Sequence, residues 1–217
     1  MIGVCIPAHN EADYIAACLQ AVRRAAARVR GESVAVVVVA DACTDATEAI
    51  ARAQGCTTLR TDGRCVGAAR AAGARHLLEQ GARWLCCTDA DSRVPANWIT
   101  AQLQCASDAV CGTIAVGDWC GHPPQVARAF RAHYQARDGH RHIHGANLGV
   151  SASAYRRVGG FTPAQAHEDV RLVQALLAQD ARIAWVRDPR VLTSARRVAR
   201  APEGFAAWLN ARAVSVA

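Results

Sequence analysis

Lysine does not occur anywhere in the 217 residues, so the formal charge of +7 rests on 25 arginines. Arginine presents a planar fork of donors that suits phosphate and carboxylate groups, which is compatible with an anionic ligand. A GC-rich coding bias would give the same composition and is the simpler explanation. The arginines are scattered instead of forming a stripe, and only 5% of residues are aromatic, which argues against a nucleic-acid partner.

Long apolar runs are missing as well, and the longest, residues 34–40, is far too short to span a bilayer. The first residues lack the basic and apolar regions of a signal peptide. The ten cysteines include no C-x-x-C pair, and adjacent Cys86 and Cys87 would point to opposite faces of a strand, so a zinc cluster lacks its usual spacing. We expect a cytoplasmic protein with reduced cysteines and no transmembrane segment, with attachment to the periphery of the inner membrane as an open alternative.

Apolar strands alternate regularly with helical patterns along the chain. Strands are predicted at residues 2–6, 34–40, 57–59, 84–88 and 109–116, and helices at about 15–29, 45–54, 66–80, behind Pro95, at 153–158 and at 168–178. This alternation predicts an α/β fold with a mainly parallel, Rossmann-like sheet and helices on both faces. With 52% apolar residues, the chain can build the full core of a single domain.

Polar side chains follow three of the predicted strands, in residues 7–11, at Asp41 and at Asp89-Ala90-Asp91. In open α/β sheets, ligands bind beyond the carboxyl ends of the strands, so these groups are expected at one crevice. Taken alone, Asp41 is better explained by capping of the helix that follows it. Asp89 and Asp91 can converge in a loop, and two hard oxygen donors suit Mg²⁺ or Mn²⁺, which share their ligand shell with substrate phosphates.

Several segments of the chain, taken in order, resemble the family 2 glycosyltransferases, which are nucleotide-sugar-dependent enzymes of the GT-A fold. They are IPAHNEADYI, VVVVADACTDAT, GAARAAGARH, TDADSRVP, HGANLGVSASAYRRVGGF and HEDVRL. A lone D-x-D is common by chance, whereas the ordered set is specific, and the resemblance runs from Ile2 to about Val198. It implies a nucleotide-binding half at residues 1–118 and an acceptor and catalytic half at residues 119–217.

The resemblance also implies roles for individual residues. The donor-binding residues that it implies are Pro7, His9, Asn10, Glu11, Asp41, Arg70, Asp89, Ala90, Gly145, Asn147, Arg196 and Arg197. Asp41 matches a carboxylate that accepts from a base N–H. Asp89 and Asp91 match the D-x-D pair that holds the cation bridging the diphosphate. Glu168 and Asp169 match the E-D pair of the family, in which the aspartate is the catalytic base.

The chemistry of glycosyl transfer accounts for this spacing independently. Negative charge grows on the departing diphosphate, and a cation held by Asp91 would stabilise it. The attacking hydroxyl needs a base on the opposite side of the sugar, and Asp169, far along the chain, is the expected supplier. Separate carboxylate sites imply direct displacement with inversion. Alone, Glu168 and Asp169 would be explained by favourable charge at a helix N-terminus.

We therefore predict a metal-dependent, inverting glycosyltransferase that takes a nucleotide-diphosphate sugar and a small-molecule or lipid-linked acceptor. One alternative is a nucleotidyltransferase, which should carry a glycine-rich basic loop after the first strand. Another is a catalytically silent binding module, against which Asp91 and Asp169 argue. If residues 140–144 are extended, His140, His142 and His144 share one face, which leaves a zinc or nickel site open as a further alternative to a polar loop over the donor site.

Overall fold

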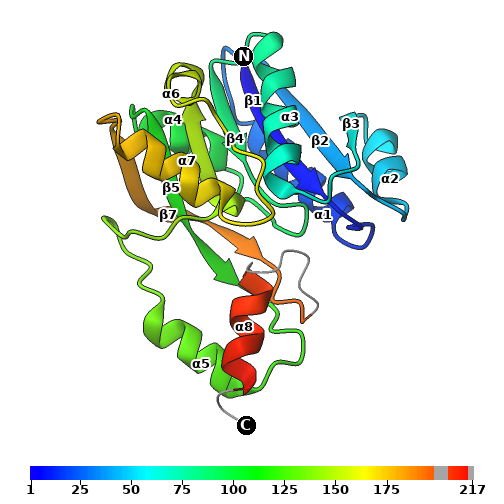
Figure 1. The fold of residues 1–217 in the computed structure, drawn as a ribbon, viewed down its shortest axis with the longest axis vertical. Helices are drawn as coiled ribbons and strands as arrows, with labels where there is room; N and C mark the ends of the chain where they lie inside the picture. The colour runs from blue at the N-terminus through cyan, green and yellow to red at the C-terminus, as the bar shows by residue number, and fades with distance from the viewer. Residues whose placement is uncertain (198–204, 215–217) are drawn as a thin grey trace.

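The structure is a computed structural model that describes residues 1–197 and 205–214, and it is built on one seven-stranded sheet (Figure 1). The strands are β1 (Ile2–Ala8), β2 (Val34–Asp41), β3 (Thr57–Thr61), β4 (Trp84–Cys87), β5 (Ala109–Val116), β6 (Leu148–Ser151) and β7 (Ile183–Thr193). Their order across the sheet is β3-β2-β1-β4-β6-β5-β7, and β6 runs antiparallel to both of its neighbours. The expectation of a single α/β domain with a mainly parallel sheet is confirmed.

Helices cover both faces of this sheet. They are α1 (Ile15–Ala26), α2 (Thr47–Ala53), α3 (Val66–Glu79), α4 (Trp98–Gln104), α5 (Pro124–His133), α6 (Ala152–Arg157), α7 (Glu168–Leu177) and α8 (Phe205–Val214), with a 3₁₀ turn, η1, at Gly145–Asn147. Within the described residues, no helix combines the length and the apolar character that crossing a bilayer requires.

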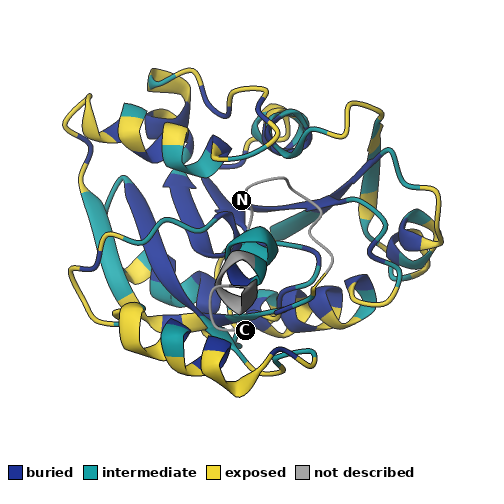
Figure 2. Ribbon diagram, turned by 60° about the horizontal axis from the view of Figure 1, so that its bottom comes forward, coloured by how far each residue is buried: buried dark blue, intermediate teal, exposed yellow. Residues whose placement is uncertain are grey.

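Alternation of side chains along the central strands divides the core into two clusters. In β4, Trp84 and Cys86 pack into the cluster that contains α1 and α4, whereas Leu85 and Cys87 pack into the one that contains α3 and α7. The predicted opposite placement of Cys86 and Cys87 is therefore confirmed, and all ten cysteines are free thiols. Figure 2 shows the result, with buried strands in dark blue between helices whose outer sides are exposed.

Close packing of α3 on β1 depends on a glycine. A Cβ on Gly73 would collide with the Sγ of Cys5 and press on Val39, so a larger residue there would push the helix off the sheet. This approach matters for the site, because α3 also carries Arg70.

The second half of the chain differs most from the sequence prediction, which missed β6, β7, α5 and α8. In β7, an Arg-Asp-Pro-Arg stretch interrupts the apolar pattern, and proline is tolerated because β7 lies at the edge of the sheet. Helices α5 and α8 pack on each other below the sheet in Figure 1, so their apolar faces do not follow the pattern of a helix lying on a sheet. The helix predicted at 15–29 ends at Ala26, and Val198, the expected limit of the family resemblance, lies outside the described residues.

Candidate active site

Two adjoining cavities lie beyond the carboxyl ends of the central strands. The first has a volume of about 220 Å³ and the second about 490 Å³. Both are bordered by Val66, Asp89, Thr193 and Phe205, so the two cavities meet at these residues. This is the edge of the sheet at which the polar residues of the sequence were expected to gather.

Most of the residues expected to bind a donor line one of the two cavities. Pro7, His9, Glu11, Asp41, Asp89, Ala90, Asp91 and Arg196 line the first cavity. Arg70, Gly145, Glu168 and Asp169 line the second. Phe205 also borders the first cavity and was missed, because no motif or periodicity marks it in the sequence.

Three expected residues are not brought to either cavity. Asn147 is fully buried, where its amide donates to the carbonyls of Thr113 and Pro189 and accepts from the indole of Trp98. It therefore ties η1 to the sheet instead of lining the acceptor site. Asn10 hydrogen-bonds Thr44, and Arg197 is exposed.

Asp41 organises the loop that leads into α3. Its Oδ1 accepts from the Thr61 hydroxyl (2.9 Å) and from the backbone N–H groups of Gly63 (3.0 Å) and Arg64 (3.2 Å). Its Oδ2 accepts from the N–H of Cys65 at 2.6 Å, the residue that precedes α3. Asp41 thus fixes the start of α3. The capping interpretation, which assigned Asp41 to the start of α2, the helix that follows it in the chain, is not supported.

Two arginines, buried Arg70 and half-buried Arg196, neutralise the carboxylates of the D-x-D segment. Arg196 pairs with Asp91 and, at 2.7 Å, with Glu11. Arg70, whose side chain is 2% exposed, pairs with Asp89 through Nη2 and with Glu168 through Nε at 2.9 Å. Burial lowers the pKa of Arg70, but Asp89 and Glu168 outweigh it and hold that pKa above its ordinary value, so the guanidinium stays charged.

Asp89 and Asp91 form a partial ligand set for a divalent cation. Both border the first cavity, and burial raises the pKa of Asp91 although Arg196 opposes the shift. Among the described residues, no three His, Cys, Asp or Glu side chains are arranged to hold a metal. Two carboxylates fit Mg²⁺ or Mn²⁺ when phosphate oxygens complete the shell, and binding would require Asp91 to exchange part of its pairing with Arg196.

Asp169 lies at the start of α7 and faces the second cavity. Its Oδ2 accepts from the N–H of Gly145 at 2.6 Å, and its Oδ1 accepts from the N–H of Val170 at 2.8 Å. Burial raises the pKa of this carboxyl, and neighbouring Arg70 offsets the effect only in part. A carboxylate that is held in place and has a raised pKa is a better proton acceptor than an exposed aspartate.

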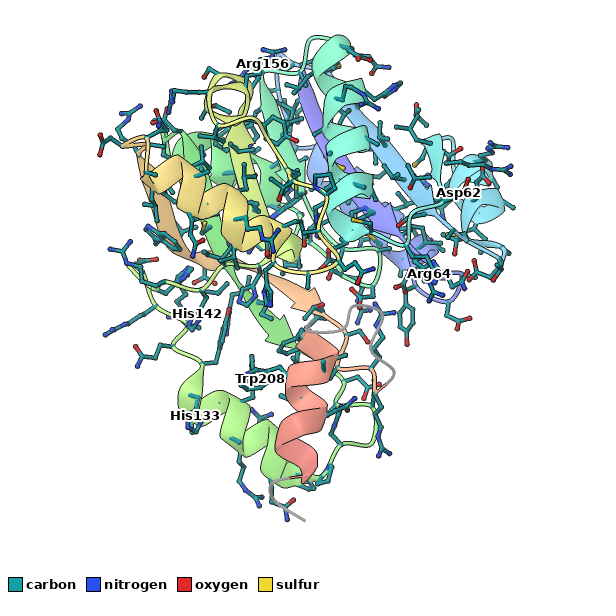
Figure 3. All side chains as sticks on the ribbon, viewed as in Figure 1. Asp62, Arg64, His133, His142, Arg156 and Trp208 are labelled. Atoms are coloured by element: carbon teal, nitrogen blue, oxygen red, sulfur yellow. The ribbon has the colours of Figure 1, made fainter. Side chains whose placement is uncertain are left out.

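Aromatic rings line part of the second cavity, which Asp89, Glu168 and Asp169 also border. The rings of Phe130 and Tyr134 stack at 4.7 Å between centroids, and those of Tyr134 and His142 at 4.2 Å. Phe205 and Trp208 of α8 complete this ring wall, as we call these five side chains, and all five border the cavity. Figure 3 shows His142 and Trp208 below the sheet, His142 above α5 and Trp208 beside α8.

The three alternating histidines stack and do not converge on a common point. The centroids of His140 and His142 lie 5.4 Å apart, and those of His142 and His144 lie 6.1 Å apart. The Nε2 of His140 bonds the carbonyl of Val186 at 3.1 Å. The alternative of a zinc or nickel site at these histidines therefore has no support within the described residues.

His144 is expected to make the folded protein sensitive to acid. Burial, with smaller effects of His142 and His140, lowers its pKa to about 3, and its Nε2 lies 3.0 Å from the Tyr134 hydroxyl. That hydroxyl accepts from the N–H of Ile114, so it donates to a neutral imidazole. Below about pH 6.5, His144 becomes protonated in the unfolded chain but stays neutral in the folded protein. The free energy of unfolding therefore decreases as pH falls from 6.5 towards 3.

Urea unfolding between about pH 7.5 and pH 4.5 measures this effect. We expect His144 to contribute a loss of about 1 kcal/mol per pH unit below pH 6.5. The His144→Gln variant, which keeps an acceptor for Tyr134, should show a flatter dependence. His76→Gln, at a partly exposed position of α3, should retain the slope of the wild type. Equal slopes in all three proteins would contradict the assignment.

Comparisons with known proteins bear on this site through family and fold. The family model described as glycosyl transferase family 2 matches residues 3–158. No curated protein sequence matches the chain.

Solved structures with the same fold share little sequence with the chain. TarS of S. aureus in complex with UDP-GlcNAc superposes with a TM-score of 0.72 at 14% identity, over 94% of this chain and 61% of TarS. The mannosyltransferase PcManGT of Pyrobaculum calidifontis, in complex with GDP-Man and Mn²⁺, gives 0.63 at 18% identity, over 95% of this chain and 59% of the other. The chain thus spans about three fifths of the length of these proteins.

Proposed function

Since the chain belongs to glycosyl transferase family 2 and has the GT-A fold, we propose that it transfers a sugar from a nucleoside diphosphate to an acceptor hydroxyl by direct displacement. The observation that carries the proposal is the joining of two cavities at Asp89, one bordered by the D-x-D carboxylates and the other by Asp169. A donor that extends from the first cavity into the second would present its sugar to Asp169. The acceptor would approach from the ring wall.

We propose that the first cavity holds the nucleoside diphosphate. Asp41, at the end of β2, and His9 would contact the base, and Asp91 with Arg196 would lie near the diphosphate; all four residues border this cavity. UDP and GDP are the nucleotides to test, since TarS was solved with UDP-GlcNAc and PcManGT with GDP-Man. Asp91 and Asp89 would hold Mg²⁺ or Mn²⁺, which supplies positive charge beside the leaving diphosphate when bound.

The remaining steps fall to side chains of the second cavity. Asp169 would accept the proton of the attacking hydroxyl, and its hydrogen bonds from Gly145 and Val170 fix the carboxylate in one orientation. Glu168 pairs with Arg70 at 2.9 Å, so it would position Arg70. Arg70 would also hold Asp89 at the junction of the two cavities.

Titration calorimetry with UDP and GDP, with and without Mn²⁺, tests the proposal. We expect one nucleotide to bind in a Mn²⁺-dependent way, and Asp91→Asn to weaken that binding roughly tenfold or more because one hard ligand is lost. Asp62→Asn, in an exposed loop outside the cavities (Figure 3), is the matched control and should bind as the wild type does. Equal Mn²⁺-dependent affinity of Asp91→Asn and wild type would refute the metal assignment.

A further inference from the structure

We propose that the acceptor is an uncharged molecule that presents its hydroxyl on a ring, held against the ring wall of the second cavity. The inference rests on the proposed function, because it names the second substrate of the same site. A sugar and a phenol share this chemistry, and a polyprenyl phosphate does not. The sequence left small-molecule and lipid-linked acceptors equally open.

The size and lining of the cavity favour a ring. At about 490 Å³, the second cavity lies within the range of pockets that enclose small organic ligands. The ring wall and Asp169 border this same cavity, so a bound ring would contact aromatic side chains while its hydroxyl reaches the carboxylate. Flat apolar surfaces of this kind favour stacking with other rings, and also suit the C–H faces of sugars.

The charges around the cavity disfavour a phosphate. Three carboxylates border the cavity, those of Asp89, Glu168 and Asp169. Among the described residues that border it, Arg70 is the one arginine. Both Nε and Nη2 of Arg70 are already engaged, by Glu168 and by Asp89, and Nη1 is buried without access to the cavity surface. An acceptor phosphate would therefore meet carboxylates without a free arginine fork to neutralise it.

His142 of the ring wall and neighbouring His144 do not supply the missing charge. Burial lowers the pKa of His142, with a smaller effect of His140, and burial lowers the pKa of His144 to about 3. Both imidazoles are therefore neutral near pH 7 and act as flat ring surfaces. Binding is best measured at about pH 8, where an ordinary histidine carries little charge.

The most direct test compares three probes by saturation-transfer NMR and titration at about pH 8, each with and without UDP and Mn²⁺. Methyl glucopyranoside represents the sugar source, 4-methylphenol, which is uncharged at this pH, the phenol source, and farnesyl phosphate the lipid-linked alternative. We expect at least one ring probe to bind with little dependence on salt between about 50 and 500 mM, since no charge pair is formed. Tighter binding of farnesyl phosphate than of both ring probes would overturn the inference.

Variants of His142 connect binding to the ring wall. His142→Ala should weaken the bound ring probe about threefold to tenfold, and His142→Phe, which keeps a flat ring, should bind within about twofold of the wild type. His76→Ala removes a partly exposed histidine of α3 outside both cavities and should change nothing. Equal binding by His142→Ala and wild type would contradict a contact with this wall.

The same samples separate the two proposals. Ring binding without any UDP or GDP binding would contradict the proposed function and leave the ring site in place. Nucleotide binding with Mn²⁺ but no binding of either ring probe would contradict the inference on the acceptor and leave the donor site in place. Thermal melting of each variant shows whether a lost signal reflects unfolding instead.

Discussion

Replacing Asp169 with asparagine is expected to lower kcat roughly 10² to 10⁴-fold while the Kd for the nucleotide stays within about threefold. A general base acts on the acceptor proton in the transition state and contributes little to donor binding in the ground state. Asp169 borders the second cavity, whereas the nucleotide is proposed to lie in the first. Steady-state kinetics and nucleotide titration on the same preparation measure the two quantities.

The variant needs a check on its fold. The carboxylate of Asp169 accepts from two backbone N–H groups, those of Gly145 and Val170, and an asparagine oxygen can serve only one of them well. A small loss of stability is expected, so a thermal melt must accompany the kinetics. Asp180→Asn makes the same chemical change at an exposed position beyond the end of α7 and should leave kcat unchanged.

The pH dependence gives a second readout for Asp169. Because burial raises its pKa, the base becomes protonated above the pH at which an exposed aspartate does. In the wild type, kcat/KM should therefore fall as pH decreases through that raised pKa, and the residual activity of Asp169→Asn should lack this acidic limb. Proton NMR of the product should show an inverted anomeric centre. A retained configuration, or normal turnover by Asp169→Asn, would disprove direct displacement with Asp169 as base.

Much of the donor half was predictable from local pattern. The apolar strands ending at Asp41 and before Asp89 have the unbroken composition of buried parallel strands, and polar groups at their carboxyl ends must meet at one edge. The local sequence pattern does not predict which side chains far apart in the chain form ion pairs. The ion pair of Arg70 with Glu168 joins residues 98 positions apart, and it depends on how α7 packs beside α3.

The acceptor half was less predictable because its side chains follow no single period. Tyr134 and His142 lie in segments without regular secondary structure, and they meet through stacking. Phe205 and Trp208 face the cavity because α8 packs on α5 and not on the sheet. The rings that form the wall are thus brought together by tertiary packing, which a scattered set of aromatic residues does not reveal in sequence.

Replacing Arg70 with leucine is expected to destabilise the protein by roughly 3–5 kcal/mol, a fall in Tm on the order of 10 °C. The guanidinium is buried and pairs with Glu168, whose side chain is 6% exposed, and with Asp89, whose side chain is 38% exposed. Without Arg70, Asp89 can still reach solvent, but Glu168 would be left as a buried, unpaired charge. Thermal and urea unfolding of Arg70→Leu measure the loss, with Arg75→Leu at an exposed position of α3 as the matched control.

Two further measurements identify the buried charge as the cause. Burial already raises the pKa of Glu168 against the opposing effect of Arg70, so removal of the arginine should raise it further. Protonation then relieves the unpaired charge, and the deficit of Arg70→Leu should shrink as pH falls from about 8 to 5. The double variant Arg70→Leu/Glu168→Leu should recover most of the stability, because an apolar pair can replace a buried ion pair at little cost. A deficit that is constant with pH and is not rescued by the second change would show that Arg70 stabilises the fold through packing and not through its charge.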